Sequence, residues 1–246
     1  SELKRYNEAV AYYEVAIEQY PNNSTICATA YNNIGLMYAY QKDYLEAITW
    51  YKKAAKRQPD YTSAYENAGD AYANMEQIDS AIDAYSQALL YSPEDPDLLH
   101  KYGMFCYLQN RPQNAVHAYR KFVGIYPKDV FGHYHLGIAL AEQGDSIAAI
   151  KSLGQALEYD PDYFDAQYFL GKLFIGQNNF FQAESLLLRA VQLRPNAADV
   201  YNDLGVTYVQ LDRYEEAISA FARALELNPA HTDARQNLEI LAEALK

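Results

Sequence analysis

Apolar residues recur along the chain at spacings of three and four, which place side chains on one face of an α-helix. The segment 28–59 carries two such stripes: Tyr31, Ile34 and Tyr38, and then Ala47, Tyr51 and Ala54. Asp43 lies between the stripes, where its carboxylate would accept hydrogen bonds from the free N–H groups that begin a helix. The pattern therefore predicts two helices joined by a tight turn.

Three residue columns repeat this unit with a period of 34. A proline ends each second helix, because it lacks an N–H and clashes with a preceding carbonyl. The prolines are Pro21, Pro59, Pro93, Pro127, Pro161, Pro195 and Pro229. Small residues occupy the positions where the two helices would approach each other. The glycines are Gly35, Gly69, Gly103, Gly137, Gly171 and Gly205, and the alanines are Ala9, Ala47, Ala81, Ala115, Ala149, Ala183 and Ala217.

These columns resemble the tetratricopeptide repeat family, whose unit is a 34-residue helix–turn–helix. The resemblance covers nearly the whole chain and implies an all-α fold, a right-handed α-solenoid (superhelix) in which stacked hairpins cover one another's apolar faces. We expect a single array over 1–246. Its full repeats would span 28–61, 62–95, 96–129, 130–163, 164–197 and 198–231.

The two ends of the array depart from the repeat. Residues 1–23 show the pattern of a second helix alone, so we expect the chain to begin inside a repeat. Residues 232–246 are predicted to form a capping helix. Its inward-facing residues would be Leu238, Ile240, Leu241 and Leu245.

The interval between Pro21 and Pro59 exceeds the repeat period by four positions. An insertion of that length corresponds to about one helical turn. We therefore predict that Ser24 caps a first helix one turn longer than the others.

Charge and cysteine content narrow the classes of partner. The chain has 20 Lys and Arg against 32 Asp and Glu, a net charge of −12, which disfavours nucleic acids and anionic membranes. No apolar run approaches the length of a membrane span.

Cys27 and Cys106 are predicted to be unlinked thiols, with Cys106 in the core. These thiols and the lack of a signal-peptide pattern favour a cytoplasmic location.

The sequence lacks the motifs that carry catalysis. It has no glycine-rich phosphate loop, no His-Glu-x-x-His and no Gly-x-Ser-x-Gly. His100 and His135 would face the same groove, but two surface imidazoles are a simpler interpretation than a metal pair. We expect no enzyme activity, no catalytic residue, no metal and no cofactor.

The resemblance implies that first helices line a concave groove that binds peptides. Spacing from the glycines assigns partner-binding positions to Asn33, Asn67, Asp70, Lys101, Met104, Tyr107, Phe131, Tyr134, His135, Tyr168, Phe169 and Lys172. Aromatic residues gather in the middle of this set. Acidic residues flank it, so the expected partner is an apolar segment with basic flanks.

Two known groove types of the family fit the set poorly. Members that grip chaperone tails use Lys, Asn and Arg, but no Arg occurs at the corresponding positions here. An asparagine ladder that clamps a peptide backbone would have two rungs, Asn33 and Asn67, before Lys101 interrupts it.

The leading hypothesis is a protein-interaction scaffold that binds a partner peptide or helix in the groove. One alternative is a self-assembling scaffold, for example a homodimer formed through a terminal repeat. The other is a substrate-recruiting module of a larger enzyme.

Overall fold

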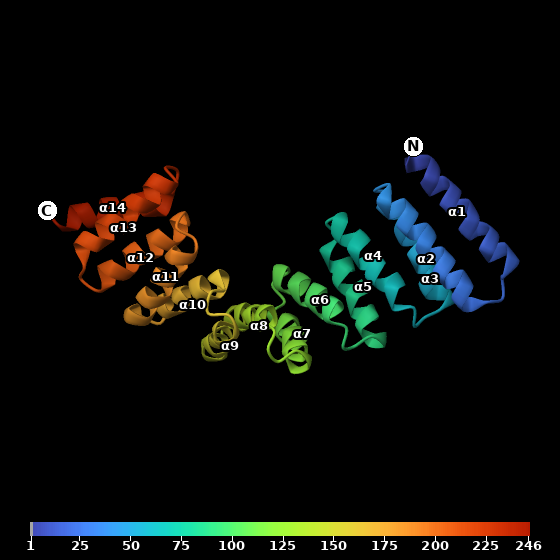
Figure 1. Cartoon of the computed structure of the whole chain (residues 1–246), viewed down its shortest axis with the longest axis horizontal. Helices are drawn as coiled ribbons and strands as arrows, with labels where there is room; N and C mark the ends of the chain where they lie inside the picture. Colours follow the sequence, from blue (N-terminus) through green and yellow to red (C-terminus); the bar gives the residue numbers. More distant parts are fainter. Residues whose placement is uncertain (1) are drawn as a thin grey trace. The chain divides into compact units, whose positions relative to one another are not determined.

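The computed structural model describes residues 2–246, except the side chains of Glu2 and Lys4. The described residues form fourteen α-helices and no strand (Figure 1). This confirms the predicted all-α helical repeat solenoid. The helices are α1 (Glu2–Gln19), α2 (Ser24–Tyr40), α3 (Tyr44–Arg57), α4 (Thr62–Asn74), α5 (Ile78–Tyr91), α6 (Pro96–Leu108), α7 (Pro112–Ile125), α8 (Val130–Glu142), α9 (Ser146–Tyr159), α10 (Phe164–Gly176), α11 (Phe180–Leu193), α12 (Ala198–Gln210), α13 (Tyr214–Leu227) and α14 (Thr232–Ala244).

The helices divide into two compact units. Unit 1 comprises residues 1–127 and contains α1 to α7, and unit 2 comprises residues 128–246 and contains α8 to α14. Within each unit, every helix packs against the next one along the chain, and successive hairpins stack (Figure 1). Because the array is composed of two units, a single array over 1–246 stays a prediction.

Glycine is required where the two helices of a hairpin cross. A Cβ atom added to Gly35 would lie 2.5 Å from the Tyr51 ring, and one added to Gly205 would lie 2.4 Å from the Phe221 ring. Both rings are buried. Glycine therefore allows the close approach that the sequence predicts, since a side chain at Gly35 or Gly205 would displace a packed ring.

The turn inside each hairpin has one residue with a left-handed backbone. The predicted cap Asp43 is confirmed, because its Oδ1 atom accepts a hydrogen bond from the N–H of Glu46. The preceding residue, Lys42, has φ of 62°. The equivalent positive-φ residues in later repeats are Glu76, Asn110, Gly144, Asn178 and Asp212.

The extra turn of α2 is confirmed, but its predicted cap is wrong. Helix α2 has 17 residues, whereas α4 and the later first helices have 13. The cap is Asn23, whose Oδ1 atom accepts from the N–H of Ile26 at 3.0 Å, and Ser24 is the first helical residue. Both side chains suit a cap, so only the backbone position of the helix start decides between them.

The two cysteines lie as the sequence predicts. Cys27 and Cys106 are both buried and unlinked, as predicted.

In α14, Leu241 is buried, but Ile240 is 57 % exposed and Leu245 is 50 % exposed, so the prediction that these two face inward is wrong. Ile240 falls one repeat period after Val206, which is itself partly exposed, and Leu245 follows the last helical residue. No helix among residues 2–246 has the length and apolar character needed to cross a bilayer.

Candidate functional site

The predicted partner-binding residues lie on one side of the first helices. We call this side the first-helix face. It contains positions 33, 67 and 101 in unit 1 and positions 135, 169, 203 and 237 in unit 2. Six predicted residues belong to each unit. Those of unit 1 are Asn33, Asn67, Asp70, Lys101, Met104 and Tyr107, and those of unit 2 are Phe131, Tyr134, His135, Tyr168, Phe169 and Lys172.

Side chains 35 positions apart meet on this face, because each repeat stacks beside the next. In unit 1, the amide of Asn67 donates to Oδ1 of Asn32 at 2.8 Å. In unit 2, the amide of Asn237 donates to Oδ1 of Asn202 at 3.0 Å. Asn67 therefore already forms a hydrogen bond to the neighbouring first helix of its own molecule. Asn33, the residue after Asn32, is half-buried.

Lys101 is the centre of a polar network in unit 1. Its Nζ atom lies 2.8 Å from Oε1 of Glu66 and 2.8 Å from Oδ2 of Asp70. Tyr85 donates its hydroxyl to the other oxygen of Asp70 at 2.7 Å. Burial opposes the charge of Lys101, but the bonds to Asp70 and Glu66 more than offset it and raise the pKa of Lys101. Burial and the bond to Asp70 also raise the pKa of Tyr85.

The other predicted residues of unit 1 are half-buried. Met104 and Tyr107 both lie on α6. On the same helix, Nδ1 of His100 lies 3.1 Å from the hydroxyl of Tyr119, and burial lowers the pKa of His100. The polar residues of this face are thus largely bonded to one another.

Unit 2 carries rings at the equivalent positions. The rings of Phe131 and His135 lie 3.9 Å apart, and those of Tyr134 and His135 lie 5.0 Å apart, both edge to face. The Tyr134 ring also packs edge to face on Tyr163 at 5.3 Å. Phe131 is 39 % exposed. Helix α8 therefore presents a cluster of aromatic edges, a favourable arrangement for rings.

Helix α10 continues the aromatic surface. Tyr168 stacks on Phe164, and Nζ of Lys172 lies 5.6 Å from the Tyr168 ring centre. Phe169 and Tyr134 pack with part of their surface on the buried cluster of Leu153, Ala156, Ala166 and Leu170. These two rings contribute to the core as well as to the face.

An acidic side chain lies beside Tyr168 on the neighbouring first helix. Burial raises the pKa of the Asp203 carboxyl, and this outweighs the lowering effects of Tyr168 and Lys172. Burial and the charge of Asp203 in turn raise the pKa of Tyr168. Asp203 is thus a carboxylate whose charge the fold disfavours.

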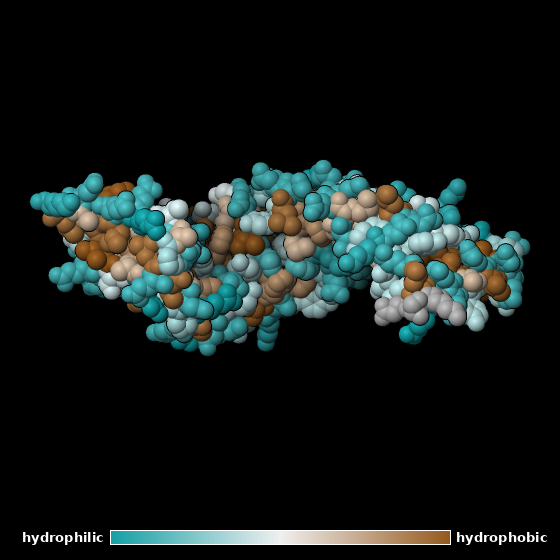
Figure 2. All heavy atoms as spheres, turned by 90° about the horizontal axis from the view of Figure 1, so that it is seen from above, coloured by the Kyte–Doolittle hydropathy of each residue, from teal (hydrophilic) through white to brown (hydrophobic). Residues whose placement is uncertain are grey.

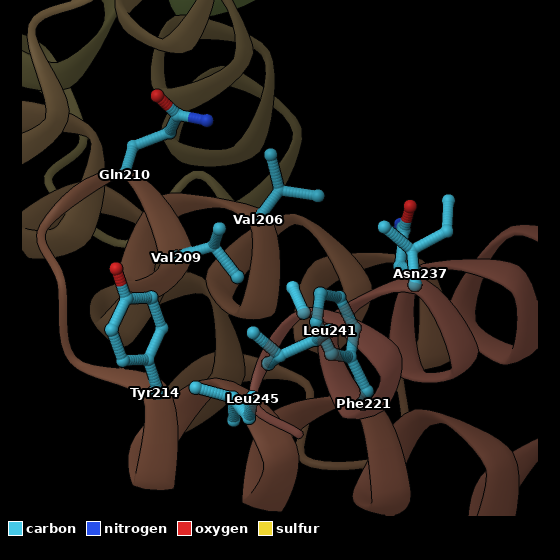
Figure 3. A pocket seen from close by; sticks show the side chains of 10 residues that line it. Val206, Val209, Gln210, Tyr214, Phe221, Asn237, Leu241 and Leu245 are labelled. Atoms are coloured by element: carbon cyan, nitrogen blue, oxygen red, sulfur yellow. The ribbon is translucent and has the colours of Figure 1, made fainter.

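A cavity of about 530 Å³ opens among α12, α13 and α14. Figure 3 shows Val206 and Val209 of α12 on one side of it, and on the other Leu241 of α14 and Leu245, which follows that helix. In Figure 2, brown atoms gather at the left of the view, where the C-terminal helices lie. The cavity is lined by Val206, Val209, Gln210, Tyr214, Phe221, Asn237, Ile240, Leu241, Ala244 and Leu245.

This cavity is absent from the sequence-based set of site residues. Ile240 and Leu245 were expected in the core, yet they line the opening. The signal that would have placed Ile240 there is its distance of one repeat period from Val206, which the spacing rule assigns to the first-helix face. In the described part of the chain, no group of three or more His, Cys, Asp or Glu side chains is placed to hold a metal ion.

Family models and solved structures give a consistent comparison. A tetratricopeptide repeat model matches residues 67–130 and 134–198, and three further models of the same description match 26–89, 170–245 and 1–23. The chain is similar to the crystal structure of MamA, with 26% identity and a TM-score of 0.65 over 70% of this chain and 94% of that chain.

Two other solved structures share the fold. YrrB, described as a TPR protein with an unusual peptide-binding site, is 21% identical, with a TM-score of 0.55 over 91% of this chain and 96% of that one. The C-terminal part of a TPR repeat-containing protein from Cytophaga hutchinsonii is 18% identical, with a TM-score of 0.72 over 95% of each chain. No curated protein gives a significant match to the sequence.

Proposed function

The chain belongs to the tetratricopeptide repeat family, and from that premise we propose that it is a protein-interaction scaffold whose unit 2 binds an apolar segment of a partner. The family and the structural neighbours are generally scaffolds without catalysis of their own. The segment would lie across the first-helix face of α8, α10 and α12. Its anchors would contact the rings of Phe131, Tyr168 and Phe169.

The observation that carries this proposal is the difference in chemistry between the two first-helix faces. In unit 1, Lys101, Glu66 and Asp70 are bonded to one another, so a partner would have to break those bonds. In unit 2, Phe131 is exposed beside other rings, and aromatic rings on a surface provide large contact areas for a partner. The cavity beside α14 adds an apolar recess to the same unit.

Charge favours basic flanks on the partner. Glu142 at the end of α8 and Asp199 at the start of α12 are both exposed. Lys or Arg residues beside the apolar anchors would therefore be attracted, mainly through a faster association rate. We expect this attraction to weaken as salt is added.

The experiment is a selection from a random linear peptide library on the intact chain, followed by affinity measurements on the selected peptides. We expect the peptides to carry bulky apolar residues flanked by Lys or Arg. A Phe131→Ala, Phe169→Ala variant should bind them at least about tenfold more weakly, which corresponds to about 1.4 kcal/mol.

The matched control is Phe181→Ala, because Phe181 is a 76 % exposed ring on the second helix α11 of the same unit. It should bind the peptides as the unchanged chain does. Equal binding by the Phe131→Ala, Phe169→Ala variant, with helical content preserved, would place the binding surface elsewhere. Light scattering over a range of concentrations tests the alternative of self-assembly.

A further inference from the structure

Two second helices of unit 1 carry positive charge in an acidic chain. Helix α3 has four basic residues and one acidic residue, and α7 has two basic residues and no acidic one. The basic residues are Lys52, Lys53, Lys56 and Arg57 of α3 and Arg120 and Lys121 of α7. These two helices therefore hold six of the chain's 20 Lys and Arg residues, although the chain has a net charge of −12.

Much of this positive charge faces solvent. Lys52, Lys56 and Arg120 are exposed, and none of them forms an ion pair with another residue that the structure describes. By contrast, Arg111, which precedes α7, lies 2.8 Å from a carboxylate oxygen of Asp79 on α5. The exposed cations of α3 and α7 therefore attract acidic groups from outside the chain more strongly than Arg111 does.

Two cavities open between successive second helices of this unit. The first has a volume of about 270 Å³ and lies between α3 and α5, with Tyr65 and Tyr72 of the first helix α4 at its base. The second has a volume of about 210 Å³ and lies between α5 and α7, with Leu99 and Tyr102 of α6 at its base. We call the surface of α3, α5 and α7 that contains both cavities the second-helix face.

Small side chains explain why the first cavity is the larger one. Ala55 and Ala68 both line it. The residues one repeat period later are Leu89 and Tyr102, which line the second cavity. The first cavity is therefore space that larger side chains fill in the next repeat, and an apolar side chain of a partner would fill it in the same way.

The residues at the borders of the cavities combine apolar and basic character. Lys52 lines the first cavity and Lys121 lines the second. Leu90 of α5 also lines the second cavity and is 68 % exposed. Asp83 of α5 lines the first cavity on the side opposite α3, and it is the one acidic residue among the described residues that line either cavity.

We propose that the second-helix face of unit 1 binds an acidic, amphipathic segment of a partner protein. Apolar side chains of the segment would occupy the two cavities. Its Asp and Glu residues would contact Lys52 and Lys56 on α3, and Arg120 and Lys121 would contact them on α7. This surface is separate from the one proposed for unit 2, because α3, α5 and α7 all belong to unit 1, and it selects a partner of opposite charge.

Two other occupants fit less well. A nucleic acid would bind the cations through its phosphates, but it would leave the apolar cavities unfilled, and the net charge of −12 would repel it. A second copy of this chain would have to offer acidic residues. Glu66 and Asp70 of its first-helix face are already bonded to Lys101.

The test uses the intact chain and three labelled helical peptides that have the same leucines on one face. The other face carries Glu in the first peptide, Gln in the second and Lys in the third. We expect fluorescence anisotropy to show saturable binding of the Glu peptide, and binding of the Gln peptide that is at least about tenfold weaker. Amide exchange should show added protection in α3, α5 and α7 when the Glu peptide binds.

Charge variants test the role of the basic border. Lys52→Glu should weaken binding of the Glu peptide by about tenfold, because an attraction becomes a repulsion. The matched control is Lys151→Glu, which changes the net charge equally at an exposed position of α9 in unit 2, and it should leave this binding unchanged. Asp83→Asn should strengthen the binding, since it removes the acidic group from the first cavity.

A cavity variant tests the apolar contact. Ala55→Leu introduces the residue type that the next repeat has at Leu89, so the fold accommodates it, and it should weaken binding of the Glu peptide by filling the first cavity. Neither Ala55→Leu nor Lys52→Glu should alter binding of the Lys peptide, whose charge suits unit 2. Failure of this proposal is therefore distinguishable from failure of the proposed function.

Four results would overturn the proposal. The first is no binding of the Glu peptide or equal binding of the Glu and Gln peptides. The second is an equal effect of Lys52→Glu and Lys151→Glu. The third is a single-stranded oligonucleotide that binds this face more tightly than the Glu peptide does. The fourth is a dimer in light scattering that Lys52→Glu converts to a monomer, because a second copy would then cover the face.

Discussion

The two units use one backbone arrangement for different chemistry on their first-helix faces. In unit 1, residues 35 positions apart form hydrogen bonds and ion pairs, as between Asn67 and Asn32 and between Lys101 and Glu66. In unit 2, the same separation gives a hydrogen bond between Asn237 and Asn202, but on α8 and α10 it brings Tyr134 and Phe169 onto a shared apolar cluster. Stacking of the repeats therefore determines which positions come into contact. The side chains at those positions determine whether polar groups bond to one another or aromatic rings remain available on the surface.

The largest change in the free energy of unfolding is expected where the two helices of a hairpin cross, and the two units should differ there. In unit 1, Gly69→Ala would place a Cβ 2.5 Å from the Tyr85 ring, whereas in unit 2 Gly171→Ala would place one 3.0 Å from Leu187. The first change should lower the free energy of unfolding by about 3 kcal/mol, since a buried ring must move. The second should be close to neutral, because about 1 kcal/mol of helix propensity offsets a smaller overlap. Urea unfolding of both variants measures this, and equal losses would contradict it.

A second pair of substitutions compares Lys101, in the ionic network of unit 1, with Lys172 in unit 2. Lys101→Met leaves Glu66 and Asp70 close together without their shared cation, and should lower the free energy of unfolding by about 1 kcal/mol, since the network is partly exposed. Lys172→Met should change it by less than about 0.5 kcal/mol, because Lys172 is exposed. Thermal and urea unfolding at low and high salt check both values, and the difference between the variants should shrink with salt.

A pH series tests the half-buried carboxylate of unit 2. The pKa of Asp203 is raised in the folded chain, so the fold loses stability as pH rises from the unfolded pKa through the folded one. Asp203→Asn should therefore be more stable than the unchanged chain at pH 7, by about 1 kcal/mol. The gain should vanish as pH falls below the ordinary pKa of an aspartate. A gain that is independent of pH would show that the charge of Asp203 is not its cause.

The last pair of substitutions compares a turn of unit 1 with the equivalent turn of unit 2. Lys42 in unit 1 and Gly144 in unit 2 occupy equivalent turn positions, with φ of 62° and 90°. Lys42→Gly should raise the free energy of unfolding by about 0.5 kcal/mol, and Gly144→Ala should lower it by about 1 kcal/mol, because only glycine adopts a left-handed backbone without strain. Thermal unfolding of the two single variants checks the opposite signs.

Much of the fold could be predicted because every repeat encodes the same packing between its two helices. The glycine and proline columns marked the hairpins, and the four extra positions between Pro21 and Pro59 marked the extra turn of α2. The choice between Asn23 and Ser24 as the cap could not be predicted, since both side chains suit that position. The exposure of Ile240 was missed because an apolar residue in an amphipathic pattern was assigned to the core.

The candidate site was less predictable than the fold. Spacing placed Lys101 and Asp70 on the first-helix face, but their bond to each other depends on how one repeat stacks beside the next. Tyr134 and Phe169 were expected as binding rings, yet both also pack on the apolar cluster of unit 2. The roles of all twelve predicted residues in binding stay predictions.

By itself, the sequence determined the period, the helical hairpins and the family, because every hairpin has the same helix crossing and small residues recur there at a fixed spacing. The tertiary structure decided which polar residues are already bonded to one another and which apolar residues border the cavity beside α14. The physical reason is that the repeat pattern encodes contacts within a hairpin. Contacts between neighbouring hairpins depend on pairs of side chains that meet only after stacking.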